Sequence, residues 1–190
     1  LLGSDLIDDT PPTVTGVEAT PTVVSDGDAG TAGFSVAVTF SEPMLADGSA
    51  DPVLTFDPNV ASTLTFESGT WNDAGTVYTA TYTVADAGVA AGSVKIGVNG
   101  AKDISTVAQA SYTAQVEFGI DTVRPTVTAF TEDNTDGVVS DADNVVTYSV
   151  TFSEAVSSLA SSDIQVLGGP AATNVTLAGD GLSATFTVQI

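Results

Sequence analysis

Cysteine and histidine are absent from this chain of 190 residues, and only three of its residues are lysine or arginine. The chain therefore cannot form a disulfide, a typical zinc, haem or iron–sulfur site, or a catalytic triad with a histidine base. Its 24 acidic residues give a formal net charge of −21, so it lacks the basic footprint that nucleic acid requires. No run approaches the roughly 18 apolar residues of a membrane span, so we expect no direct membrane insertion. These absences leave two kinds of function: hydrolysis by a pair of carboxylates, and binding of hard cations through oxygen ligands.

The rest of the composition is that of a folded protein. Charged residues make up 14% of the chain and apolar residues 43%. Disordered chains combine high net charge with low hydrophobicity, so this apolar fraction argues against disorder. The length suits one or two domains of ordinary size. Because there is no cysteine, packing or bound metal rather than disulfides would have to stabilise the chain outside a cell.

An internal repeat organises the chain. Four blocks of sequence recur in the same order: 7–15 at 120–128, 23–28 at 138–143, 38–42 at 150–154 and 80–84 at 184–188. We therefore predict a tandem array, with the tail of a preceding repeat or a linker at 1–8, a complete domain at 9–120 and a C-terminally incomplete domain at 121–190. Either further residues complete the second domain, or a neighbouring chain donates a strand to its open edge.

Apolar residues alternate with threonine and serine in both copies, as in the segments 34–41 and 77–84. A period of two residues predicts β-strands with one buried face. In the first copy this pattern predicts seven strands, near 13–18, 34–41, 53–57, 63–67, 77–84, 93–98 and 111–118. Seven short strands in one domain is the number typical of an immunoglobulin-like sandwich. The predicted fold class is thus all-β, with tandem immunoglobulin-like β-sandwiches, and the one helical turn we expect lies at 86–91.

Three segments resemble bacterial Ig-like (BIg-type) repeats. They are Asp-Thr-x-x-Pro-Thr-Val-Thr at 121–128, Val-Thr-Phe-Ser-Glu-Pro-Met at 38–44, and Gly-Ala-Lys-Asp at 100–103. Such repeats fill the stalks of giant secreted or surface adhesins, including the RTX type of marine and biofilm-forming bacteria. The resemblance covers nearly the whole chain and implies an extracellular module at the bacterial cell surface, with calcium at domain junctions. One departure is that Ile-Ser-Thr follows Asp103, where the family often has Ala-Gly-Asn.

Strand parity predicts where several carboxylates lie. The inward positions of the strand at 34–41 continue to Glu42, and those of its counterpart in the second copy continue to Glu154. A carboxylate is costly inside a sandwich, so we expect both glutamates at the end of the core rather than within it. The acidic loops at 26–28 and 141–143 precede the same strands and should lie at the opposite end. Two carboxylates of such a loop can face one Ca²⁺ ion, which takes about 6–8 oxygen ligands.

Asp121 lies between the two copies in the sequence. We expect it to share a calcium ion with Glu42 or Asp103 of the first copy, and with loop acids of the second, either Asp141 or Asp143. Asp8 has the place of Asp121 at the start of the first copy. The candidate calcium ligands are Asp121, Asp26, Asp28, Asp141, Asp143, Glu42, Glu154, Asp103, Asp8 and Asp9. The alternative is that these acids form turns and keep the surface soluble.

The function that these patterns favour is a structural spacer in the stalk of a long bacterial surface adhesin, stiffened by calcium. Its partners would be the neighbouring repeats, with a glycan or host-surface partner bound elsewhere in the parent protein. Alternatives are a filament or surface-layer subunit, or a module that binds a glycan or a partner through loops near Trp71. We do not expect an enzyme, because no pair of acids stands out as the two carboxylates of a glycosidase.

Overall fold

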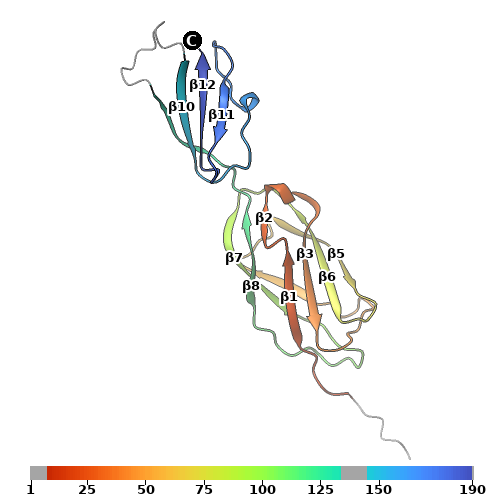
Figure 1. Cartoon of the computed structure of the whole chain (residues 1–190). Helices are drawn as coiled ribbons and strands as arrows, with labels where there is room; N and C mark the ends of the chain where they lie inside the picture. Colours follow the sequence, from red (N-terminus) through yellow and green to blue (C-terminus); the bar gives the residue numbers. More distant parts are fainter. Residues whose placement is uncertain (1–7, 134–144, 190) are drawn as a thin grey trace, which may run out of the picture. The chain divides into compact units, whose positions relative to one another are not determined.

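The structure is a computed structural model that describes residues 8–133 and 145–189. Where described, the chain is almost entirely β-sheet, with three four-stranded sheets and two short 3₁₀ helices (Figure 1). The fold class is therefore all-β. Two compact units make up the chain, unit 1 at Leu1–Val123 and unit 2 at Arg124–Ile190. No helix in the described residues is long and apolar enough to cross a membrane.

Unit 1 contains two of the sheets. The first sheet has the order β1-β3-β6-β5 and is antiparallel throughout, with β1 (Val14–Thr20), β3 (Gly30–Phe40), β6 (Val77–Val84) and β5 (Leu64–Trp71). The second sheet has the order β2-β8-β7-β4, with β2 (Val23–Ser25), β8 (Gln115–Asp121), β7 (Ala90–Asn99) and β4 (Val53–Asp57). Strands β2 and β8 are parallel, and the other pairs of this sheet are antiparallel.

One hydrophobic core lies between these two sheets. Phe34 of β3, Ile96 of β7 and Ile120 of β8 are all fully buried in it. Burial alternates along β6, where every second side chain from Tyr78 onward is buried. The intervening threonines are only half-buried, as expected for a pleated surface with one buried face.

Two details of unit 1 differ from the sequence-based expectations. The predicted helical turn at 86–91 is wrong, because β7 already begins at Ala90 and the residues before it have no regular structure. Val89 instead exchanges hydrogen bonds with Thr122: Thr122 donates its N–H to the Val89 carbonyl (2.8 Å), and Val89 donates to the Thr122 hydroxyl (3.0 Å). The three-residue strand β2 was not predicted, since its pairing with β8 depends on tertiary contacts.

Unit 2 repeats the first sheet of unit 1. Its sheet has the order β11-β12-β10-β9 and is antiparallel, with β9 (Val127–Glu132), β10 (Val145–Phe152), β11 (Thr173–Leu177) and β12 (Ser183–Gln189). By the sequence repeat these strands correspond to β1, β3, β5 and β6. Phe186 and Val188 of β12 belong to a small core.

Hydrogen bonds between side chains and backbone also recur between the units. The backbone N–H of Thr13 donates to the Ser41 hydroxyl (3.0 Å), and that of Thr126 donates to the Ser153 hydroxyl (2.9 Å). In both units this bond ties the residue before the first strand to the residue after the long central strand. The sequence repeat is therefore also a repeat of local structure.

Candidate metal centre

Three carboxylates meet at one end of unit 1. Asp8 precedes β1, Glu42 follows the end of β3, and Asp103 follows the end of β7. One oxygen atom from each side chain lies within 4.8 Å of the others. Asp8 is exposed, Glu42 is half-buried and Asp103 is buried. The group therefore reaches from solvent into the end of the core.

The loop after β7 fixes Asp103 in place. Its Oδ1 accepts a hydrogen bond from the backbone N–H of Val107 (2.8 Å), and its own N–H donates to the Val107 carbonyl (3.0 Å). The N–H of Thr106, whose φ of 68° is in the left-handed region, donates to the Asp103 carbonyl (3.0 Å). Asp103 also forms an isolated antiparallel bridge with Met44. The side chain is thus held before any ligand arrives.

The second carboxylate oxygen of Asp103 has no partner. The side chain is 0% exposed, and Oδ2 is buried without a hydrogen bond. Burial of an unsatisfied polar group costs about 1–3 kcal/mol, and more when the group is charged. Buried polar atoms in folded proteins nearly always have a partner, so an exception needs an explanation. A cation between the three carboxylates would supply it.

The surroundings of Glu42 point the same way. Burial, followed by the negative charges of Asp8 and Asp103 and a side-chain hydrogen bond with Asp8, raises the pKa of Glu42 above its ordinary value. Three acids close together disfavour one another's charged forms, whereas a bound cation favours them. Asp8 is oriented by its own turn, since its Oδ1 accepts a hydrogen bond from the N–H of Thr10 (3.1 Å).

The spacing of the oxygen atoms is compatible with Ca²⁺. Calcium–oxygen distances are about 2.3–2.6 Å, so opposite ligands of one ion lie about 4.6–5.2 Å apart. One oxygen atom from each of the three carboxylates lies within 4.8 Å of the others, so a single hard cation could contact all three. Three carboxylates supply only part of a calcium shell of about 6–8 oxygens, and water or backbone carbonyls would complete it.

The position of Asp121 corrects one sequence-based expectation. Asp121 ends β8, where its Cα partners are Ser25 of β2 and Ala90 of β7. Ser25 immediately precedes the 3₁₀ helix η1 (Asp26–Asp28), which leads into the start of β3. Glu42 lies past the other end of β3, whose 11 residues span about 35 Å. The expectation that Asp121 shares a calcium ion with Glu42 or Asp103 is therefore wrong. The acid that lies close to these two residues is Asp8.

The remaining candidates of unit 1 lie outside this group. Asp26 is exposed in η1, which comes directly before β3, so it lies at the end of unit 1 where β3 begins, as expected. Asp28 Oδ2 accepts hydrogen bonds from the N–H (2.8 Å) and the hydroxyl (2.9 Å) of Ser25, so this carboxylate closes the turn. Asp9 is exposed beside Asp8. Their assignment as calcium ligands stays a prediction.

Unit 2 contains one further candidate within the described residues. Glu154 is half-buried, and its Oε1 is buried without a hydrogen bond. This glutamate has the sequence position of Glu42, whereas the unpartnered acidic oxygen of unit 1 belongs to Asp103. Asp141 and Asp143 lie outside the described residues.

Trp71 is packed rather than presented as a sugar-binding platform. Its ring lies 5.1 Å from that of Tyr78 and 5.7 Å from that of Phe40, measured between centroids. Its indole N–H donates to Asp51 Oδ1 (2.8 Å). The tryptophan therefore has both its apolar and its polar partners within unit 1.

No protein-family model matches the sequence, and no curated protein matches it.

Proposed function

We propose that the chain is a spacer made of tandem immunoglobulin-like domains, in which calcium ties each domain to the segment that leads into it. The observation that carries this proposal is that Asp103, whose Oδ2 is buried and unpartnered, forms one group of carboxylates with Asp8 and Glu42. Hard cations with flexible coordination prefer such a set of oxygen ligands.

The three ligands come from three separate segments of the chain. Glu42 and Asp103 belong to the domain, because they follow core strands. Asp8 belongs to the stretch before β1, outside both sheets. A cation that binds all three would fix this stretch to the end of the domain. In an array, the preceding repeat reaches the domain through this stretch, so fixing it limits bending between neighbours.

The repeat supports extension of this scheme along the chain. Asp121 has the sequence position of Asp8, and Glu154 has that of Glu42. The alternating strands and the recurring strand order support the immunoglobulin-like assignment. Extracellular calcium-binding modules have dissociation constants of about 0.1–1 mM, which suits a surface location without a tightly closed site. The resemblance to bacterial adhesin repeats supports the same setting.

Calorimetric titration and small-angle scattering test the proposal. The wild-type chain and the variants Asp103→Asn and Asp73→Asn are titrated with CaCl₂, and with MgCl₂ at matched ionic strength. Asp73 is exposed in a turn and serves as the control. We expect calcium binding by the wild type and Asp73→Asn, with a narrower distribution of particle lengths, and weaker binding by Asp103→Asn.

Two results would contradict the proposal. Equal effects of calcium and magnesium in all three proteins would mean that the acids only respond to ionic screening. Unchanged calcium binding in Asp103→Asn would remove the observation on which the site depends. The circular dichroism spectra of the variants establish that each remains folded.

A further inference from the structure

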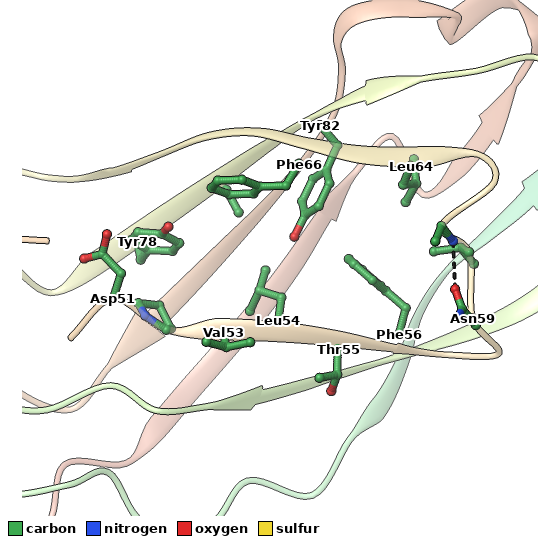
Figure 2. Close-up of a pocket in the computed structure, with 14 residues that line it drawn as sticks. Asp51, Val53, Leu54, Thr55, Phe56, Asn59, Leu64, Phe66, Tyr78 and Tyr82 are labelled. Atoms are coloured by element: carbon green, nitrogen blue, oxygen red, sulfur yellow. Dashed lines mark hydrogen bonds between the residues drawn. The ribbon is translucent and has the colours of Figure 1, made fainter. Parts of the chain in front are cut away.

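A cavity of about 690 Å³ opens between the two sheets of unit 1, at the side where β4 and β5 are the edge strands. Figure 2 shows β4 and β5 along its two sides, with side chains of both strands facing the gap. Tyr78, Ala80 and Tyr82 of β6 form its floor. This volume is within the range of about 300–1,000 Å³ that is usual for ligand sites.

The walls of the cavity are aromatic and incompletely covered. Leu54 and Phe56 of β4 are only half-buried, and Phe66 of β5 is 56% exposed. The rings of Phe56 and Phe66 both meet the ring of Tyr82 edge-on, with centroids at 5.5 and 5.8 Å. The apolar surface of these side chains therefore remains accessible to a partner.

Two phenol hydroxyls at the cavity have no protein acceptor. The side chains of Tyr82 and Tyr78 are only 5% and 3% exposed, yet neither hydroxyl has a hydrogen-bond partner among the described residues. The Tyr82 hydroxyl points across the gap toward β4 (Figure 2). Burial raises the pKa of Tyr82 to about 12, with a smaller contribution from Tyr78, so this hydroxyl remains a donor. Neither hydroxyl oxygen is among the buried atoms without a partner, so both can reach water, and an acceptor on a ligand in the cavity would replace that water.

Both side walls also offer free backbone groups. Within the described residues, β4 pairs with β7 alone and β5 with β6 alone, so each strand has one edge without a partner there. The five residues of β4 extend for about 17 Å. Dividing the cavity volume of 690 Å³ by this length gives the cavity a mean cross-section of about 40 Å². For comparison, one strand in a sandwich has a cross-section of about 48 Å², because strands lie about 4.8 Å apart within a sheet and sheets about 10 Å apart. The cavity is therefore close to one strand in width.

The strand β4 has an acid at each end. Asp51 lines the cavity just before β4, and Asp57 is the last residue of the strand. Asp57 has Lys95 as its Cα partner on β7, while the chain as a whole carries 24 acidic residues against three basic ones. A partner with basic residues beside its apolar segment complements this charge.

The geometry points to a binding site for an extended peptide strand of another protein, with apolar side chains at alternate positions and basic residues at its ends. The peptide backbone pairs with a free edge of β4 or β5, as in β-strand addition. Its apolar side chains fill the space beside Leu54, Phe56 and Phe66. Its carbonyl groups accept hydrogen bonds from the hydroxyls of Tyr82 and Tyr78. This site is independent of the calcium ligands and of the spacer role.

Amide chemical-shift titrations of the ¹⁵N-labelled chain test this inference. The probe is the synthetic peptide Lys-Val-Thr-Phe-Thr-Val-Lys with blocked ends, and the control peptide has serine in place of both valines and the phenylalanine. We expect saturable shifts in β4 and β5 with the probe and none with the control peptide. The titration is performed with and without calcium, and binding should be the same in both.

Three variants sharpen the test. Phe66→Ser removes exposed apolar wall and should weaken binding about tenfold. Tyr82→Phe removes only a hydroxyl without a partner, so it should weaken binding about fivefold without lowering the melting temperature. Val116→Ser is the matched control, because Val116 is 53% exposed on β8, away from this cavity, and should change nothing.

Several outcomes would overturn the inference. The inference is wrong if the probe causes no chemical-shift changes at millimolar concentration. It is also wrong if the serine peptide binds equally well, because binding would then depend only on attraction between charges. Shifts that map to other strands, or binding unaffected by Phe66→Ser, exclude this cavity. Concentration-dependent dimerisation that blocks the probe would make a second copy the occupant. Binding of the neutral dye Nile red without binding of the peptide would assign the cavity to small apolar molecules.

Discussion

Replacement of Gly69 by alanine should destabilise unit 1 through one defined collision. A Cβ at this position of β5 would lie 1.8 Å from the Tyr78 hydroxyl oxygen and 2.3 Å from the ring carbon that carries it. No φ in the left-handed region is involved at Gly69, so the effect comes from contact alone. The Tyr78 ring packs against Trp71, which in turn packs against Phe40, so a shift of Tyr78 into the cavity that it lines would disturb these contacts.

The size of the effect follows from overpacking. Insertion of a methyl group into a packed site costs about 1–3 kcal/mol, and alanine regains about 0.5–1 kcal/mol over glycine within a strand. The net loss should be about 1 kcal/mol, and at most about 2.5 kcal/mol. A domain of this size loses about 4 °C in melting temperature per kcal/mol, so we expect a decrease of about 4 °C, and at most about 10 °C.

Trp71 provides the assay and Gly92 the control. Trp71 is the chain's single tryptophan and contacts Tyr78, so its fluorescence during urea or thermal unfolding reports unit 1 at the site of the change. Gly92 lies in β7, where an added Cβ would meet nothing within 4 Å, so Gly92→Ala should be neutral or slightly stabilising. Equal stability of the two variants would refute the reasoning. Addition of Tyr78→Phe to Gly69→Ala should restore part of the loss.

Three further predictions concern titration and the repeated hydrogen bond. The pKa of Glu42 is raised in the folded state, so the calcium-free chain should become less stable as pH rises from the ordinary pKa of this group to its raised pKa. Melting curves from pH 4 to 7 should show this loss of stability. Either Glu42→Gln or saturating calcium should abolish it. Tyr82, with its pKa of about 12, should likewise lower stability as pH rises above its ordinary value of 10, and absorbance titration at 295 nm should lose its latest component in Tyr82→Phe. Ser41→Ala and Ser153→Ala each remove one acceptor, so each should cost about 0.5–1.5 kcal/mol in its own unit, and urea unfolding of the double variant should show additive losses.

Most of the fold follows from alternation in the sequence. The period of two residues located the long strands, because a half-buried pleated strand leaves that pattern in the side chains. Their bounds differ in places, since β8 begins at Gln115 rather than near 111 and β5 continues to Trp71 rather than ending near 67. The segment at 86–91 misled because its alanines and acid also suit a helical turn. Its actual conformation depends on Thr122, far away in the sequence. Strand β2 is too short to show any period.

The site was predictable in part. Strand parity places Glu42 beyond the core, and the structure agrees because side-chain direction along a strand is a local property. The partners of Glu42 depend on the paths of two separate segments, before β1 and after β7. Parity does not describe such paths, so Glu42 and Asp103 were expected to share an ion with Asp121, while Asp8 was a candidate ligand without assigned partners. The cavity left no signal either, since it depends on two edge strands of different sheets staying apart.

The parallel pairing of β2 with β8 has a mechanical consequence. Strand β2 lies near the start of unit 1 and β8 at its end, and Val23–Ser25 pair in register with Gly119–Asp121. When tension pulls the start and the end of the unit apart, parallel strands slide along each other, so the hydrogen bonds between them resist together in shear. An antiparallel hairpin pulled from its open end would lose its bonds one at a time. The short pairing of β2 with β8 therefore makes unit 1 resist mechanical unfolding at the end where the chain leaves it.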